Sequence, residues 1–225
     1  MSSDKSFLAL RLEGPLQSWG FDSQYNRRNT SLMPTKSAVA GMCCAALGYQ
    51  RGSSEEAAFL DKFIAVKMMA IAKPRNAGIK ELSVRRLQDY HTVRNTRTAA
   101  GKPKDCHITN RQYLTDAAFG VLLEGDSTLF KQVAAALENP IWGIWLGRKA
   151  CIPTAPVLAG LRENRDEALK LILKDKQLDS FTRQEDVVTF ADGRDSFPDM
   201  PVSFASDRRL FAPRRVMTKQ AGERD

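Results

Sequence analysis

The first apolar segment alternates along the chain in the way that a half-buried strand does. Its larger apolar side chains occupy every second position, at Leu8, Leu10 and Leu12. Ala9 and Arg11 occupy the positions between them, so the segment 7–12 predicts a strand with one buried face. The following residues, 13–20, contain Gly14 and Pro15 and predict a loop.

Two helices are predicted next. The first begins at Pro34-Thr35-Lys36-Ser37, with Thr35 or Ser37 as its N-cap, and ends at Gly48. Its apolar face, with the spacing of one side of a helix, consists of Val39, Met42, Cys43, Ala46 and Leu47. The second helix is expected over 55–63, with Ser54 as its cap.

Three further strands and a helix complete the pattern up to Pro140. Strands are predicted over 64–72, 82–90 and 113–123, and a helix over 127–138 that ends at Asn139-Pro140. The order strand, helix, strand, strand, helix is most of a ferredoxin-like βαββαβ unit. The fold class expected is therefore α+β, with the architecture that RNA-recognition domains share.

The last third of the chain is expected to be rich in loops. A helix is predicted over 165–174, and the acids of the segment 177–201 are attributed to a solvated loop of open role. No internal repeat and no biased linker divides the chain, so a single domain is expected over 1–225.

A strongly basic run connects the second and third of these strands. Its cations are Arg94, Arg97, Lys102, Lys104 and Arg111. Asp105 is the only acid between Val93 and Arg111. We expect a hairpin here, an insertion over about 88–113, that projects beyond its sheet. So much positive charge on a projecting element indicates a polyanionic partner.

The composition agrees with this interpretation and excludes several classes of protein. The chain has 225 residues, 43% of them hydrophobic, and a formal net charge of +8, which suits a nucleic-acid partner. The start lacks an apolar signal core, and the longest apolar stretch, 38–47, is too short to span a membrane. Four cysteines form no CxxC pair, and only two histidines occur, so neither a metal site, nor a disulfide framework, nor a cofactor is expected. A reduced cytoplasmic protein fits these features.

Two groups of cations are candidates for phosphate contacts. Arg148 and Lys149 follow a glycine-flanked tryptophan, where backbone could approach a phosphate closely; a tight turn with surface cations is the alternative. Arg27 and Arg28 on a loop, with Lys36 at a helix start, form the second group. Ordinary surface charge is the alternative for each of these three.

Aromatic side chains offer a second kind of RNA contact. Tyr90, Tyr113 and Trp19 could stack on bases, although each could equally be a half-buried edge residue, above all Trp19. His91 lies beside Tyr90 and could act as a general base or as a positioning residue.

Ribonuclease chemistry without a metal is the first alternative to simple binding. Its candidate acids and bases are Tyr90, His91, Lys102, Lys104 and His107. Both histidines lie in the expected hairpin, which is a poor scaffold for groups that need fixed positions. Binding without catalysis is therefore favoured over cleavage.

Several segments together resemble one protein family. They are Leu10–Gly20, Pro34–Ser37 with Gly41, Leu87–Val93, Arg111–Phe119, Leu146–Pro153 and Phe204–Ser206. The chain resembles the CasD group of CRISPR-associated Cascade subunits, the type I-E form of the Cas-five group of RAMP proteins. The resemblance covers most of residues 6–160 and is thin over 162–201. The interior of the hairpin, 94–110, agrees in character only.

The resemblance implies a modified RNA-recognition fold with a projecting thumb. It implies a non-catalytic subunit that binds the five-prime handle of the guide RNA (crRNA), contacts the backbone and large subunits of the complex, and meets target DNA only through them. On this basis Arg94, Arg97, Lys102, Lys104 and Arg111 would line or flank the thumb, and Arg27, Arg28, Lys36, Arg148 and Lys149 would hold handle phosphates. Tyr90, His91 and Tyr113 would position the base of the thumb or stack on the handle. An adaptor that contacts only acidic proteins is the remaining alternative.

Overall fold

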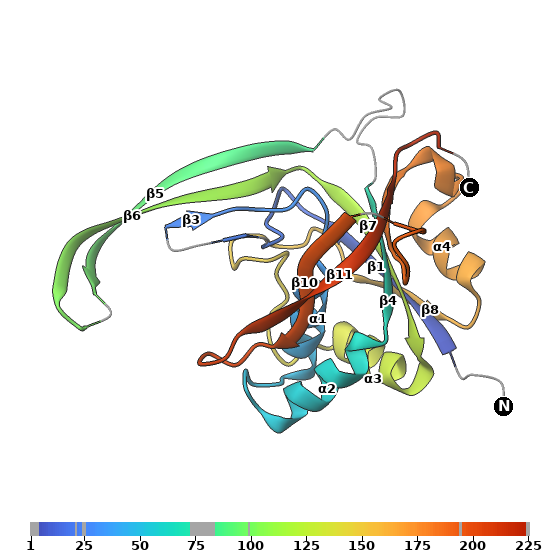
Figure 1. Cartoon of the computed structure of the whole chain (residues 1–225), viewed down its shortest axis with the longest axis horizontal. Coiled ribbons are helices and arrows are strands. Elements are labelled where there is room, and N and C mark those ends of the chain that lie inside the picture. The colour runs from blue at the N-terminus through green and yellow to red at the C-terminus, as the bar shows by residue number, and fades with distance from the viewer. Residues whose placement is uncertain are drawn as a thin grey trace.

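The molecule consists of a large antiparallel sheet with helices on both of its faces and a long hairpin that projects from it (Figure 1). The computed structural model describes residues 5–20, 22–23, 26–72, 84–98, 100–193 and 195–223. The sheet has seven strands in the order β10-β11-β9-β4-β7-β1-β8. No helix among these residues has both the length and the apolar character needed to cross a membrane.

Four of the seven strands form a ferredoxin-like unit with two of the helices. Its elements are β1 (Lys5–Glu13), α1 (Lys36–Leu47), β4 (Lys67–Ala72), β7 (Ala118–Asp126), α3 (Ser127–Glu138) and β8 (Leu158–Arg162). The central pair, β1 and β7, is antiparallel, β4 flanks β7, and β8 flanks β1. The predicted α+β class and ferredoxin-like order are therefore confirmed.

The C-terminal part adds three strands to this sheet, so the expectation of a loop-rich end was wrong. They are β9 (Thr182–Asp186), β10 (Asp195–Ser203) and β11 (Leu210–Lys219), and β9 pairs with β4. Within the acidic segment, Asp199 is only 3% exposed and Asp186 forms ion pairs, so these two acids are not in a solvated loop. The stretch 139–157 has no helix or strand.

The first strand is buried on both faces rather than on one. Leu8, Leu10 and Leu12 pack in the core that includes α1 and α3. Ala9 is fully buried on the opposite face, against α4 (Arg165–Leu173) and the short helix η1 (Leu178–Ser180). The predicted helix 165–174 is thus confirmed as α4. Because α4 covers the second face of β1, the small apolar Ala9 is buried there.

The helix caps come partly from distant segments. Thr35 is the N-cap of α1, but its side chain makes no capping bond; instead the Lys36 amide donates to Asp199 Oδ2 over 2.8 Å. Gly48 ends the helix in the left-handed conformation, as expected. The second helix, α2 (Ser54–Ile64), is capped by Ser53 rather than by Ser54.

The projecting hairpin consists of β5 (Arg85–Arg97) and β6 (Pro103–Thr115), two strands of 13 residues each. Two short strands, β2 (Leu16–Gln17) and β3 (Arg27–Arg28), pair with the base of β6. Residues 85–90 of the predicted strand 82–90 lie in β5. Val84 precedes the strand, and Leu82 and Ser83 are outside the described part of the chain.

The predicted strand 113–123 proved to be parts of two strands in different sheets. Asp116 has a φ of 51°, which turns the chain from β6 in the hairpin into β7 in the large sheet. Asp tolerates this left-handed conformation better than most residues. The turn at Asp116 is therefore what directs the hairpin out of the body.

Candidate nucleic-acid interface

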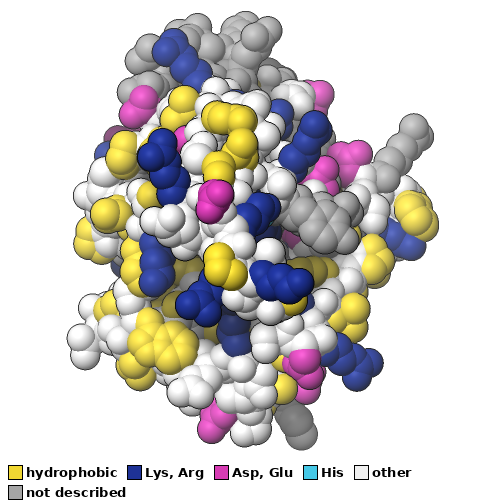
Figure 2. Space-filling model, turned by 90° about the vertical axis from the view of Figure 1, so that its left-hand side faces the viewer, with side chains coloured by type: hydrophobic (Ala, Val, Ile, Leu, Met, Phe, Trp, Pro, Cys, Tyr) yellow, Lys and Arg dark blue, Asp and Glu magenta, His cyan; other side chains and the backbone are white. Residues whose placement is uncertain are grey.

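Five arginines line one cavity at the base of the hairpin. They are Arg28 of β3, Arg51, Arg111 of β6, Arg148 and Arg209. The cavity has a volume of about 530 Å³, and none of the described residues that line it is acidic. Figure 2, seen from the hairpin's side, shows Lys and Arg gathered over the centre of this face and acids mainly toward its periphery. A cavity with this lining concentrates anions.

The electrostatics of Arg209 reflect this crowding. Burial lowers the pKa of its guanidinium, and the positive charges of Arg51 and Arg28 lower that pKa further. The guanidinium also lies 5.3 Å from the centre of the Phe211 ring. Like charges held together cost free energy, and a bound phosphate would offset that cost.

Arg148 holds the base of the hairpin to the body. Its guanidinium donates to the carbonyl oxygens of Gln112 and Arg28, over 2.9 and 2.8 Å. It also stacks on Tyr113, 4.6 Å from the ring centre. The side chain is half-buried. Arg148 therefore both contributes charge to the cavity and joins β3 to β6.

The loop that carries Arg148 lies very close to the residues after β2. The Ser18 amide donates to the Leu146 carbonyl over 2.9 Å, and the Leu146 amide donates to the Cys151 carbonyl over 2.7 Å. Gly147 has a φ of 100°, and a Cβ there would lie 1.7 Å from the Ser18 carbonyl oxygen. Only glycine fits at this position. The glycine next to the candidate arginine thus permits a close approach of protein backbone.

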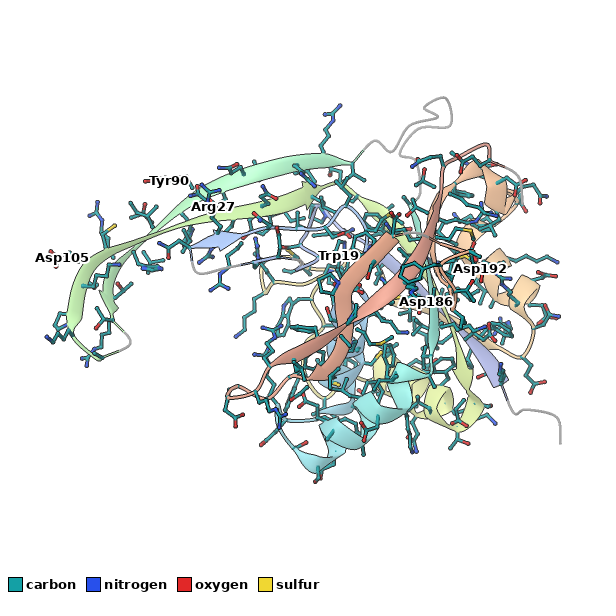
Figure 3. The ribbon with its side chains drawn as sticks, viewed as in Figure 1. Trp19, Arg27, Tyr90, Asp105, Asp186 and Asp192 are labelled. Carbon is teal, nitrogen blue, oxygen red and sulfur yellow. The ribbon has the colours of Figure 1, made fainter. Side chains whose placement is uncertain are left out.

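The remaining hairpin cations are exposed, as the sequence indicated. Arg94, Arg97, Lys102 and Lys104 lie toward the tip, together with Asp105. Figure 3 shows Asp105 near the tip of the hairpin and Tyr90 on the hairpin away from the body. Arg27, on β3, lies beside the hairpin. Tyr90 is 64% exposed, which leaves its ring accessible for stacking.

The pairing of β5 with β6 places both histidines on one face of the hairpin. His91 is opposite Thr109 and His107 is opposite Val93, so the two are diagonal neighbours. His91 Nδ1 lies 3.5 Å from Asp89 Oδ2, and His107 Nδ1 lies 3.3 Å from Lys104 Nζ. No group of three potential metal ligands occurs in the part of the chain that the structure describes.

Two predicted contact residues are buried and cannot meet RNA as proposed. The side chain of Lys36 is 1% exposed, and its Nζ lies 2.8 Å from Asp186 Oδ2 and also donates to the Val66 carbonyl. Burial lowers the pKa of this amine, and Asp186 opposes that shift. Tyr113 is 7% exposed and lies beneath Arg148. The prediction that Lys36 holds a phosphate was wrong, because its amine is buried against Asp186 and the Val66 carbonyl. Burial also contradicts stacking of Tyr113 on RNA, whereas the other role predicted for Tyr113, positioning of the hairpin base, stays a prediction.

Other predicted residues keep an accessible position. Arg27 and Lys149 are exposed, with Lys149 Nζ 5.9 Å from the centre of the Trp145 ring. Trp19 is fully buried and donates from Nε1 to Gln17 Oε1, so it cannot stack on a base and is more deeply buried than the half-buried edge residue stated as its alternative. Arg51 and Arg209, which line the cavity, were missed. Arg209 lies in a basic stretch near the Phe204–Ser206 motif, whereas no local pattern indicates Arg51.

Comparisons with known proteins agree with the resemblance found in the sequence. The family model described as CRISPR-associated protein (Cas_Cas5) matches residues 7–217. The CRISPR system Cascade subunit CasD of Escherichia coli (strain K12) is 31% identical over 173 residues, which cover 75% of this chain and 76% of that protein.

Two solved structures are similar over almost the whole chain. One, titled a CRISPR RNA-guided surveillance complex, is 28% identical with a TM-score of 0.72 and covers 96% of this chain and 90% of that chain. The other, titled a crystal structure of a Cas protein, is 29% identical with a TM-score of 0.68 and covers 96% and 94%. The predicted resemblance to CasD is confirmed, and the chain belongs to the CRISPR-associated Cas5 family.

Proposed function

We propose that this chain is a guide-RNA-binding subunit of a type I-E-like CRISPR surveillance complex. It binds the five-prime handle of the guide RNA and helps to dock the backbone and large subunits, and it does not cut RNA. The similarity to a Cascade subunit and to a chain from an RNA-guided complex supports this assignment. Target DNA is met through the assembled complex rather than by this chain alone.

The observation that carries the proposal is the arginine cavity at the base of the hairpin. The positive charges of Arg51 and Arg28 lower the pKa of Arg209, and Arg111 and Arg148 line the same cavity. Exposed cations of the hairpin continue from it toward the tip. RNA phosphates would follow this continuous basic surface, and Tyr90 would be available to a base.

The salt dependence of single-stranded RNA binding tests the cavity. Each phosphate contact contributes about 0.7 to the slope of log affinity against log salt. Replacing Arg28, Arg51 and Arg209 with Gln should therefore reduce the slope by about 2. The matched control replaces Lys170, Lys174 and Lys176, on the α4 side away from the hairpin (Figure 1). Equal slopes for both variants would remove the cavity from the proposed site.

Metal-independent cleavage is the second candidate, and the common face of His91 and His107 favours it. Two histidines on one face could share the roles of general base and acid. Labelled repeat RNA incubated with the chain in EDTA tests this activity. Cleavage at one position that a His91→Ala, His107→Ala variant loses would replace the binding proposal with a nuclease.

A protein adaptor without RNA contacts is the third candidate. Its hairpin cations would contact acidic surfaces of neighbouring subunits. Assembly of the complex to the same extent with and without guide RNA would favour the adaptor. Assembly that requires guide RNA supports the binding proposal.

A further inference from the structure

A second cavity opens from the arginine cavity and has a different lining. The six residues common to both cavities are Ser18, Gly20, Ser37, Arg51, Gly147 and Arg209. The second cavity has a volume of about 370 Å³, and its aromatic lining consists of Tyr49, Trp142, Trp145 and Phe204. The two adjoining cavities therefore offer a cationic lining and an aromatic lining side by side. These are the linings that would suit the phosphate and the base of one nucleotide.

The tryptophan wall is held in place by backbone hydrogen bonds. The Ile141 and Trp142 amides donate to the Ala46 and Ala45 carbonyls at the end of α1, over 3.0 and 3.2 Å. A Cβ on Gly143 would lie 2.8 Å from the Trp145 ring, so the indole packs directly on this glycine. Trp142 and Trp145 nevertheless remain 40% and 37% exposed. Their rings form a stacking surface that needs little ordering when a ligand binds.

A buried carboxylate also lines this cavity. Glu56 is 2% exposed, and its Oε2 accepts from the Gly52 amide over 2.6 Å. Its Oε1 is buried and has no hydrogen-bond partner among the described residues. A buried acceptor without a donor is unfavourable. A ligand N–H that reaches Oε1 would satisfy it.

We propose that the aromatic cavity is a subsite for one RNA base that carries an amino group. The inference rests on the proposed function, since the phosphate of the same nucleotide would lie in the arginine cavity. The base stacks on the indoles, and its exocyclic amino group donates to Glu56 Oε1. Uracil has a carbonyl oxygen where cytosine has its amino group, and the carboxylate would repel that oxygen.

The charges at the junction of the cavities favour a base over a protein side chain. A lysine or arginine would suit Glu56 and the tryptophans, but Arg51 and Arg209, which line the same cavity, would repel it. An acidic side chain would be attracted by those arginines and then repelled by Glu56. An amino-bearing base is neutral and brings its own phosphate to the arginines.

Cytosine and uracil oligonucleotides test this subsite, because the two bases differ at one edge. The full chain would be titrated with labelled rC8 and rU8, which have equal length and charge. We expect about tenfold tighter binding of rC8. Glu56→Gln retains an acceptor for the Gly52 amide and places a donor at Oε1, so it should remove the preference. Trp145→Ala should weaken both oligonucleotides.

Glu55→Gln is the matched control, since Glu55 is exposed in the same turn of α2. It should leave the preference intact. Equal binding of rC8 and rU8 by the unmodified chain would reject the subsite without any variant. Retention of the preference by a folded Glu56→Gln chain would also reject it. If the arginine variants still lower the salt slope, the proposed function stands and only the base subsite is rejected.

Discussion

At the scale of single residues, Gly147 determines how closely the Arg148 loop approaches the body. Gly147→Ala should lower the free energy of unfolding by at least about 2 kcal/mol, because a Cβ would lie 1.7 Å from the Ser18 carbonyl oxygen at a φ of 100°. Urea unfolding measures the loss. Gly101→Ala is the control, since Gly101 has a φ of 78° with nothing within 4 Å of the added Cβ. It should cost about 1 kcal/mol, and equal losses would contradict the steric explanation.

The sequence correctly predicted accessible positions for cations in the hairpin, but it did not predict which polar side chains elsewhere are buried. Arg94 and Lys104 lie in a mostly polar run, and both are exposed. Lys36 and Tyr113 also have polar neighbours in the sequence, yet both are buried: Lys36 pairs with Asp186, and Tyr113 lies beneath Arg148. Asp186 is 150 residues from Lys36 along the chain, and Arg148 is 35 residues from Tyr113, so no local pattern contains these partners.

At the scale of secondary-structure elements, β10 supplies the cap that α1 lacks. Asp199 Oδ2 accepts from the Lys36 amide, and both Asp199 oxygens accept from Arg214, each over 2.8 Å. Asp199→Ala would leave a buried guanidinium with only Asp186 and an uncapped helix. The expected loss of stability is about 3–5 kcal/mol, measured by urea unfolding.

Asp195→Ala on the same strand is the control for this prediction. Asp195 is exposed and accepts one hydrogen bond, from Thr218 Oγ1 over 3.1 Å. Its replacement should cost less than about 1 kcal/mol. Similar losses for the two variants would show that the buried network does not stabilise α1 against the C-terminal strands.

Arg148 makes a second prediction at this scale, because it joins β3 to β6. Arg148→Lys keeps the charge but cannot donate to the Gln112 and Arg28 carbonyls in the same fork geometry. The Asn110 amide, which donates to the Asn26 carbonyl over 2.8 Å, should then exchange its hydrogen roughly fivefold faster. Lys149→Ala should leave this rate unchanged. An unchanged rate in Arg148→Lys would show that the base of the hairpin is held without Arg148.

Elements were predictable where local periodicity and caps agree, as for α3, which spans the predicted residues. The boundary at Asp116 was not, because an aspartate within a strand-like pattern does not reveal its φ of 51°. The strand β10 was missed because it contains Pro198, Asp199 and Pro201, which disfavour strands. It exists because it lies at an edge of the sheet and because Arg214 neutralises its buried acid.

At the scale of the whole molecule, the hairpin and the body are stabilised separately. None of the described residues from 93 to 107 is buried, whereas the pairs between β3 and β6 begin at Asn110. The cations toward the tip therefore add charge without adding to the core. Shortening the hairpin should therefore leave the core of the sheet intact.

A shortened hairpin tests this separation. Thr92 and Ile108 are opposite each other, so an Asn-Gly turn can join them in place of residues 93–107. The midpoint of thermal unfolding should change by no more than about 4 °C. The slope of log RNA affinity against log salt should fall by up to about 3, because Arg94, Arg97, Lys102 and Lys104 are removed. A full-length chain with these four cations replaced by Gln should show the same slope if charge is the cause. Failure of the shortened chain to fold would contradict the separation, and an unchanged slope would show that the tip makes no phosphate contacts.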